Sequence, residues 1–243
     1  MTASSRVGCV RTNNEDMVLA FNKLVRSDSY NTEFESTNSD RFVVAVADGM
    51  GGHNAGEIAS ETTLSNLQYY ISDLPRKLSP DEFHEAINQW LASINKIVDS
   101  RGRADNTMSA MGTTLVGMLY YSGRYYVINC GDSRLYRFRH GEIRQLTVDH
   151  SLNTMTGQKK HSNVITNCIG AGCKNSYLDF DDITDDILPN DKYLICSDGL
   201  NDMVSDDILC KLLQQGATAG ELCEEAIMSG GYDNVSACVI TVY

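Results

Sequence analysis

Five aspartates lie where apolar, strand-like stretches begin or end. Asp48 follows the apolar residues 43–47, and Asp198 follows the strand-like residues 193–197. Each of these two is followed by a glycine and then by a helical pattern. A single aspartate at such a position is most often a turn or capping residue. Five together predict a site where carboxylates gather at one edge of the fold, and the set is Asp16, Asp48, Asp132, Asp198 and Asp233.

Carboxylates that gather in a partly dry site repel one another, so the gathering is costly unless cations neutralise it. Carboxylate oxygens, the backbone carbonyl of the glycine after Asp48, and water are ligands that suit Mg²⁺ or Mn²⁺. Zinc is disfavoured, because the five histidines form no His-x-x-x-His pair and the eight cysteines form no cluster. Two ions about 3.5–4 Å apart would acidify a shared water and aim it at a phosphorus. The residues therefore predict metal-assisted phosphoester hydrolysis.

The surrounding sequence predicts the elements that must position these acids. Apolar residues recur at helical spacing over residues 58–71, and a second helix is marked by Ser79 as N-cap, Pro80 at its first position and Glu82 in a capping box. Strands are predicted over 113–121, 124–130, 134–139, 142–147 and 235–243, with helices starting from Ser205 and Thr218 between the last two. Two consecutive antiparallel hairpins and outer helices indicate an α+β sandwich rather than a βαβ repeat.

Composition limits the class of protein. The formal net charge of −12 argues against a nucleic-acid or anionic-membrane partner. The N-terminus lacks a signal-peptide pattern and no apolar stretch is long enough to span a bilayer, so we expect a cytoplasmic protein. The cysteines are interpreted as reduced, mainly core residues. No linker or repeat divides residues 1–243, which predicts a single domain, and the polar residues 26–40 are predicted to form a surface loop.

Six motifs occur in an order that resembles a known family. They are "VRTNNED", "VVAVADGMGGHNAGEIAS", "GTTLVG", "INCGDSRLYRFRHGEIRQLTVDHSL", "LICSDGLNDMV" and "GYDNVS". Together they resemble the bacterial branch of the metal-dependent PPM, or protein phosphatase 2C, serine/threonine phosphatases, from about Gly8 to the C-terminus. The resemblance implies a four-layer α-β-β-α sandwich, in which helices flank two antiparallel sheets.

The resemblance also implies a metal-ligand set. Asp48 would bridge two ions, the carbonyl of Gly49 would bind one of them, and Asp198 and Asp233 would bind the other. Asp132 resembles the aspartate that shares a third, weaker ion with Asp198, with a tight-turn role as the alternative. The implied cofactor is Mn²⁺ or Mg²⁺.

Four further residues match motif positions near this set. Glu15 or Asp16 would hold metal-bound waters, and Arg11 would grip the substrate phosphate with its guanidinium fork. His53 resembles the histidine proposed to protonate the leaving oxygen, although the extra glycines of "DGMGGH" shift it, so a loop-packing or water-binding role stays open.

The leading prediction is an enzyme that hydrolyses phosphoserine and phosphothreonine in proteins, acting as a monomer on the products of a cognate kinase. Two alternatives stay open: a pseudophosphatase that only binds phosphoproteins, and a hydrolase for a small phosphorylated metabolite. The segment 151–181 is shorter than the flap that usually follows "DHSL" in bacterial relatives, which predicts a more open cleft.

Overall fold

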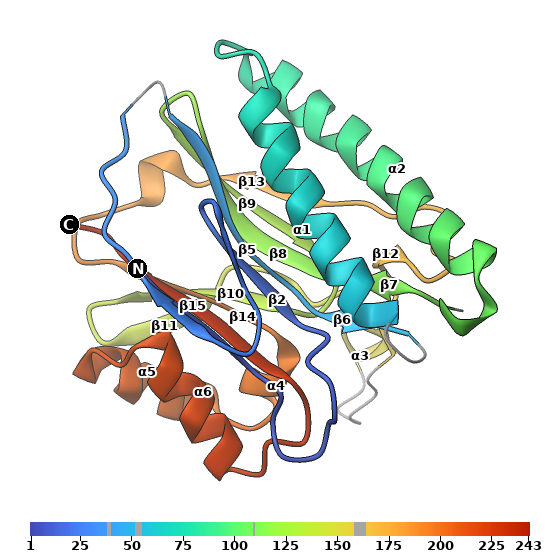
Figure 1. The fold of residues 1–243 in the computed structure, drawn as a ribbon. Helices are drawn as coiled ribbons and strands as arrows, with labels where there is room; N and C mark the ends of the chain where they lie inside the picture. The colour runs from blue at the N-terminus through green and yellow to red at the C-terminus, as the bar shows by residue number, and fades with distance from the viewer. Residues whose placement is uncertain (38–39, 52–54, 109, 158–163) are drawn as a thin grey trace.

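The chain folds into two six-stranded antiparallel sheets that pack face to face (Figure 1). The computed structural model describes residues 1–37, 40–51, 55–108, 110–157 and 164–243. The first sheet has the spatial order β11 (Glu142–Gln145), β10 (Arg134–Arg139), β14 (Lys192–Cys196), β15 (Val235–Thr241), β1 (Thr2–Arg6) and β4 (Ser29–Asn31). The second has the order β13 (Asp179–Asp182), β9 (Arg124–Cys130), β8 (Leu115–Tyr121), β5 (Arg41–Ala47), β2 (Met17–Ala20) and β3 (Lys23–Val25). A small third sheet joins β12 (Ile169–Gly170), β7 (Gly112–Thr113) and β6 (Gly49–Met50).

Helices cover the outer face of each large sheet, as Figure 1 shows. The long helices α1 (Ala55–Asp73) and α2 (Pro80–Ala104) pack on the second sheet. The first sheet is covered by α4 (Asp198–Asn201), α5 (Asp206–Gln215) and α6 (Ala219–Met228). The short elements α3 (Leu152–Thr156), η1 (Asn106–Met108) and η2 (Thr184–Asp186) lie in connections. The predicted four-layer α-β-β-α sandwich is confirmed.

Three hydrophobic cores follow from this layering, and β5 contributes to two of them. Val43 and Ala45 face α1 and α2, whereas Val44 and Val46 face the first sheet. A strand buried on both faces needs a continuous apolar run, which explains why residues 43–47 do not alternate with polar residues. The strand that leads to Asp48 is therefore fixed from both sides.

The predicted helix starts are confirmed at two capping boxes. Ser79 Oγ accepts from the Glu82 N–H at 3.3 Å, and Glu82 Oε2 accepts from the Ser79 N–H at 2.8 Å. Thr218 and Glu221 repeat the arrangement at the start of α6. Each box satisfies two backbone N–H groups that a helix terminus leaves unpaired, so local sequence alone defines these boundaries.

The prediction of a loop over residues 26–40 is wrong in part, because Ser29–Asn31 form the edge strand β4. β4 pairs with β1, where Ala3 lies opposite Tyr30. Edge strands are held by backbone hydrogen bonds on one side and tolerate polar side chains, which hides them from hydrophobic pattern analysis. The two predicted hairpins, β8–β9 and β10–β11, both form but belong to different sheets, so the chain crosses between the sheets at residues 131–133.

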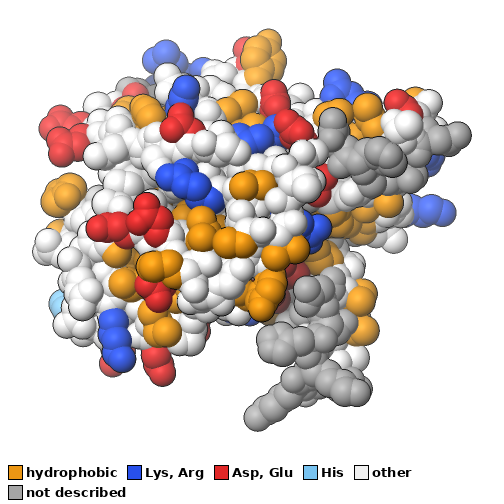
Figure 2. Space-filling view, turned by 60° about the horizontal axis from the view of Figure 1, so that its bottom comes forward, with side chains coloured by type: hydrophobic (Ala, Val, Ile, Leu, Met, Phe, Trp, Pro, Cys, Tyr) orange, Lys and Arg blue, Asp and Glu red, His pale blue; other side chains and the backbone are white. Residues whose placement is uncertain are grey.

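The remaining global predictions concern cysteines, surface charge and the flap. All eight cysteines are free and five are buried, with Cys9 exposed. Acidic, basic and hydrophobic side chains are interspersed on the face shown in Figure 2. Within the described ranges, no helix has both the length and the apolar character needed to cross a membrane.

The segment 151–181 contains α3 and β12, but residues 158–163 lie outside the described residues, so its role as a flap stays a prediction.

Candidate metal centre

Asp16 and Asp48 lie at the same end of two neighbouring strands in the second sheet. Asp16 directly precedes β2, and Asp48 directly follows β5. The antiparallel register places Met17 opposite Ala47. Because the two acids extend the paired strands by one residue each, strand pairing itself brings these distant parts of the sequence together.

Asp198 and Asp233 occupy matching positions on the first sheet. Asp198 follows β14 and Asp233 precedes β15, two strands that pair with Cys196 opposite Ala237. Asp132 lies in the crossing from β9 in the second sheet to β10 in the first. The charges of the other four acids all act on Asp48, which places the five carboxyls at one edge of the sandwich.

Burial and mutual repulsion raise the pKa values of the clustered carboxyls. Loss of hydration raises the pKa of the fully buried Asp16 to about 7, and the charges of Asp198 and Asp233 act in the same direction. Burial likewise raises the pKa of Asp132 to about 7 and that of Asp198 to about 6. For Asp48, burial and the neighbouring carboxyls raise the pKa well above its usual range. These groups can ionise together only if a cation compensates their charge.

The carboxyl oxygens of this cluster fit a hard cation. Within the described residues, Asp16 Oδ1, Asp132 Oδ1 and Asp198 Oδ1 are buried and accept no hydrogen bond. A buried carboxylate oxygen without a partner is costly, and Mg²⁺ or Mn²⁺ would satisfy it. Among the residues that the structure describes, no three His, Cys, Asp or Glu side chains lie close enough together to form a metal-ligand set by themselves. An ion bound at this edge would complete its ligand set with water and a backbone carbonyl, which Mg²⁺ accepts.

The turn after Asp48 depends on two glycines. A Cβ on Gly49 would lie 2.1 Å from the Gly56 carbonyl oxygen, and one on Gly56 would lie 2.6 Å from the Gly49 carbonyl carbon. The start of α1 therefore packs directly on the backbone of Gly49. Thr113 Oγ1 donates to the Asp48 carbonyl at 2.8 Å, and Thr114 Oγ1 accepts from the Asp48 N–H at 3.0 Å. These contacts hold the backbone of the predicted bridging residue from both strand and helix.

Asp16 is oriented by buried serine hydroxyls, which the sequence reasoning missed. Ser197 Oγ donates to Asp16 Oδ2 at 2.7 Å and accepts from the Ser236 N–H at 3.0 Å. The hydrogen bonds from Ser197 and Ser236 favour the ionised carboxylate and oppose the rise of the Asp16 pKa caused by burial. The signal that the sequence offers is the serine that separates an apolar strand from Asp198.

Arg11 lies at the same edge but pairs with an acid of the cluster. Its Nη2 donates to Asp233 Oδ2 at 2.7 Å, which raises the pKa of the guanidinium, and the charges of Glu15 and Asp48 also act on it. The Arg11 side chain is 52% exposed and that of Asp233 is 37% exposed. Burial raises the pKa of Glu15. The structure thus adds a contact that the sequence did not predict, between the expected phosphate ligand and an expected metal ligand.

His53 lies outside the described residues, so its predicted role stays open. The other predicted site residues all lie at or beside this edge of the sandwich. Their individual roles as metal, water or phosphate ligands stay predictions: Arg11, Glu15, Asp16, Asp48, Gly49, Asp132, Asp198 and Asp233.

Known proteins with similar sequences and folds share this arrangement of elements. The family model described as protein phosphatase 2C matches residues 21–228. The serine/threonine protein phosphatase PstP of Mycobacterium tuberculosis is 30% identical over 250 residues, covering 99% of this chain but 44% of its own length. This chain therefore spans less than half of that relative. The serine/threonine phosphatase stp of Listeria monocytogenes is 29% identical, covering 85% of this chain and 86% of its own.

Solved structures extend the likeness to three dimensions. The serine/threonine phosphatase of S. agalactiae superposes with a TM-score of 0.81 at 27% identity, and all of both chains is covered. The catalytic domain of PstP in complex with two manganese ions superposes with a TM-score of 0.72 at 29% identity, covering 99% of this chain and 98% of that one. By sequence and by fold, this chain belongs to the protein phosphatase 2C family.

Proposed function

We propose that this chain is a metal-dependent serine/threonine protein phosphatase. The observation that carries the proposal is the set of buried aspartate oxygens that accept no hydrogen bond, gathered where both sheets end. Such oxygens fit hard divalent ions. Arg11 lies beside them, where its guanidinium can bind a phosphate group. Family membership places phosphoserine and phosphothreonine hydrolysis ahead of other phosphoester chemistry.

In this proposal Asp48, the carbonyl of Gly49, Asp198 and Asp233 hold two divalent ions, Mn²⁺ or Mg²⁺. Asp132, together with Asp198, holds a third and weaker ion. When bound, the ions supply charge neutralisation and an acidified water for attack on phosphorus. The PstP catalytic domain, which carries two manganese ions in its solved structure, supports the two-ion part by similarity.

Protein groups orient the reactants around these ions. Glu15 or Asp16 holds metal-bound waters, and the Ser197 hydroxyl keeps Asp16 in one orientation. Arg11 exchanges its hydrogen bond with Asp233 for oxygens of the substrate phosphate, an exchange made easy by the solvent exposure of both partners. His53 donates a proton to the departing alkoxide.

The proposed substrates are proteins that a serine/threonine kinase of the same cell has phosphorylated. The chain would act there as a monomer in the cytoplasm, with residues 1–243 as one catalytic unit. Its formal charge of −12 leaves nucleic acid as an unfavourable partner.

The test is turnover of a phosphothreonine peptide with Mn²⁺ and with EDTA. We expect phosphate release only with the metal, and a higher kcat/KM on the peptide than on free phosphoserine. No release with any divalent ion would favour the pseudophosphatase. A preference for the free amino acid would favour the small-molecule hydrolase.

A further inference from the structure

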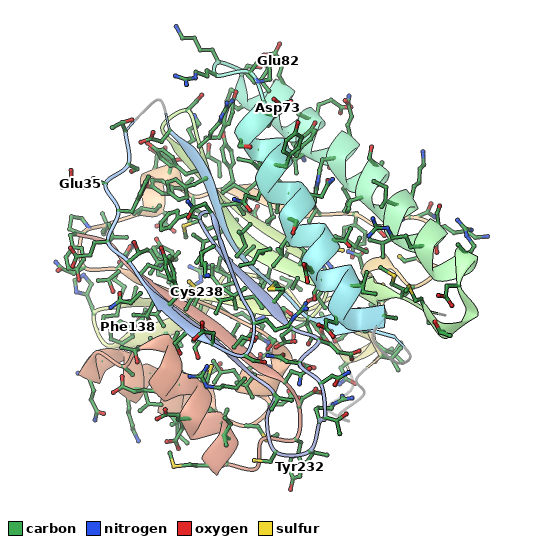
Figure 3. All side chains as sticks on the ribbon, viewed as in Figure 1. Glu35, Asp73, Glu82, Phe138, Tyr232 and Cys238 are labelled. Atoms are coloured by element: carbon green, nitrogen blue, oxygen red, sulfur yellow. The ribbon has the colours of Figure 1, made fainter. Side chains whose placement is uncertain are left out.

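The loop that carries Arg11 packs against the loop that precedes β15, although Arg11 and Asp233 are 222 positions apart. The Cys9 N–H donates to the Gly231 carbonyl at 2.7 Å. A Cβ on Gly8, which has φ +78°, would lie 2.2 Å from the Asp233 carbonyl oxygen, so only glycine allows this approach. The two loops lie side by side at the bottom of the view in Figure 1, and Tyr232, labelled in Figure 3, marks their outer edge.

Asn234 joins the two loops at three points. Its Nδ2 donates to the Val7 carbonyl at 2.9 Å and to the Asn13 carbonyl at 2.8 Å, and its Oδ1 accepts from the Glu15 N–H at 2.8 Å. Asn234 is 5% exposed, and its side chain uses both hydrogens of its amide nitrogen. Val7 lies before Arg11, and Asn13 and Glu15 lie after it, so Asn234 holds both ends of the segment that carries Arg11.

We propose that Asn234 is a positioning residue that holds the segment 7–15 so that Arg11 meets a phosphate monoester at the metal centre. The inference rests on the proposed function, because it assigns phosphate binding to Arg11. The Arg11 side chain is long and half exposed. The backbone of its loop must therefore be fixed if the guanidinium is to be held at one position beside the phosphate. Since only an amide offers two donors and an acceptor in this geometry, aspartate cannot replace Asn234.

The alternative is that Asn234 only stabilises the fold. A double-mutant cycle with Arg11 separates the two, because a purely structural residue has no reason to couple to one distal guanidinium. The probe is inorganic phosphate, and the readout is its affinity for the Mn²⁺-loaded protein measured by calorimetry. The variants are Asn234→Ala, Arg11→Ala and the double variant.

The matched control is Asn95→Ala. Asn95 lies on α2 in the outer helix layer, where its Nδ2 donates to the Cys173 carbonyl at 2.8 Å and its Oδ1 accepts from the Gly170 N–H at 2.6 Å. It therefore joins two backbone segments as Asn234 does, without contacting the Arg11 loop. We expect both alanine variants to lower Tm, but only Asn234→Ala to weaken phosphate binding.

We expect Arg11→Ala and Asn234→Ala each to weaken phosphate affinity by roughly tenfold or more, the usual size of a lost charge-assisted contact. The double variant should bind phosphate no more weakly than Arg11→Ala alone, and Asn234→Ala should keep Mn²⁺ affinity within about threefold. If Asn234→Ala does not fold, Asn234→Asp keeps the volume and the acceptor for Glu15 but turns an oxygen toward two carbonyls, and should give the same loss.

The inference is overturned if the two single effects multiply in the double variant, or if Asn234→Ala binds phosphate like the native chain. It is also overturned if Arg11→Ala leaves phosphate affinity unchanged. Failure of the proposed function has a different signature, which is a native chain that binds Mn²⁺ and phosphate but releases none from a phosphothreonine peptide.

Discussion

Arg11 Nη2 lies 2.7 Å from Asp233 Oδ2, so one hydrogen bond joins the residue expected to bind substrate phosphate to a residue expected to bind metal. Both side chains are partly exposed. Ion pairs of this kind contribute about 0–1 kcal/mol, because water and salt compete with them. The pair is therefore weak enough for a metal ion and a phosphate group to replace it.

Replacing Arg11 should impair catalysis without weakening metal binding. We expect Arg11→Ala to lower kcat/KM by roughly tenfold to a thousandfold, since a charge-assisted phosphate contact is lost. Mn²⁺ affinity should be unchanged or up to about fivefold tighter, since the guanidinium no longer competes for Asp233. Steady-state kinetics and calorimetry measure the two quantities.

The control for this pair of measurements is Arg103→Ala, which removes a similar exposed ion pair with Asp99 on α2. It should change neither quantity. Unchanged kinetics for Arg11→Ala would remove Arg11 from the site, and weaker Mn²⁺ binding would show that it supports the metal ligands instead.

The metal-free chain should lose stability as pH rises from about 5 to about 8. The pKa of Asp16 and of Asp132 is raised to about 7 in the folded protein, so between the ordinary aspartate range and pH 7 the folded state holds more protons than the unfolded state. The free energy of unfolding then falls with rising pH across that window. Acids with lowered pKa values, such as Asp191, are already ionised throughout it. Urea midpoints in EDTA measure the trend.

Two comparisons isolate the cause of this pH trend. Asp16→Asn should make the trend shallower, because the neutral amide binds no proton in this window while Asp132 still does. Saturating Mn²⁺ should reduce or reverse it, because the ions stabilise the ionised carboxylates. A metal-free chain that gains stability over this window would contradict the prediction.

Local sequence patterns were enough to predict much of this fold. The position of the aspartates at strand ends was enough to predict that they gather at one edge. The run before Asp48 is apolar because β5 is buried on both faces, and the capping boxes mark two helix starts. By contrast, β4 is a polar edge strand, and its partner β1 is separated from it in the sequence by β2 and β3, which belong to the other sheet. The contacts of Ser197 and Asn234 were not predicted either, since they span 181 and 219 positions and depend on the tertiary structure.

Ser197→Ala tests whether the hydroxyl behind Asp16 matters for metal binding. The Ser197 hydrogen bond favours the ionised Asp16, so its loss should raise the pKa of that carboxyl further. We expect the free energy of unfolding to change by about 1–3 kcal/mol, and Mn²⁺ affinity to fall more near pH 6 than near pH 8. Ser72→Ala, which removes an exposed bond to the Tyr69 carbonyl, is the control. Equal Mn²⁺ losses at both pH values would refute the pKa argument.

His53→Gln tests the proton donor. A histidine that protonates the departing alkoxide matters for phosphoserine peptides, but hardly for p-nitrophenyl phosphate, whose leaving group is already a stable anion. We expect kcat to fall roughly a hundredfold or more on the peptide and much less on the aryl ester. Equal losses on both substrates would indicate a structural role.

Asp132 and Asp198 should separate two kinds of metal site. Asp198 is expected to bind an ion of the two-metal core and has a buried Oδ1 that accepts no hydrogen bond in the described residues. Asp198→Asn should therefore abolish turnover and weaken Mn²⁺ binding throughout. Asp132 lies in the crossing between the sheets and is expected to contact only the third ion, which has few protein ligands.

Asp132→Ala should keep two tightly bound Mn²⁺ ions by calorimetry, yet lose much of its rate and the activation seen at millimolar metal. The chemical reason is that the attacking water needs the first two ions, whereas a third can orient a water as proton donor or position the substrate. Full activity with unchanged Mn²⁺ dependence would mean that "GDSR" is only a turn. A folded Asp132→Ala chain that no longer binds the first two ions would place Asp132 in the core, because its buried Oδ1 would then be satisfied by a core ion.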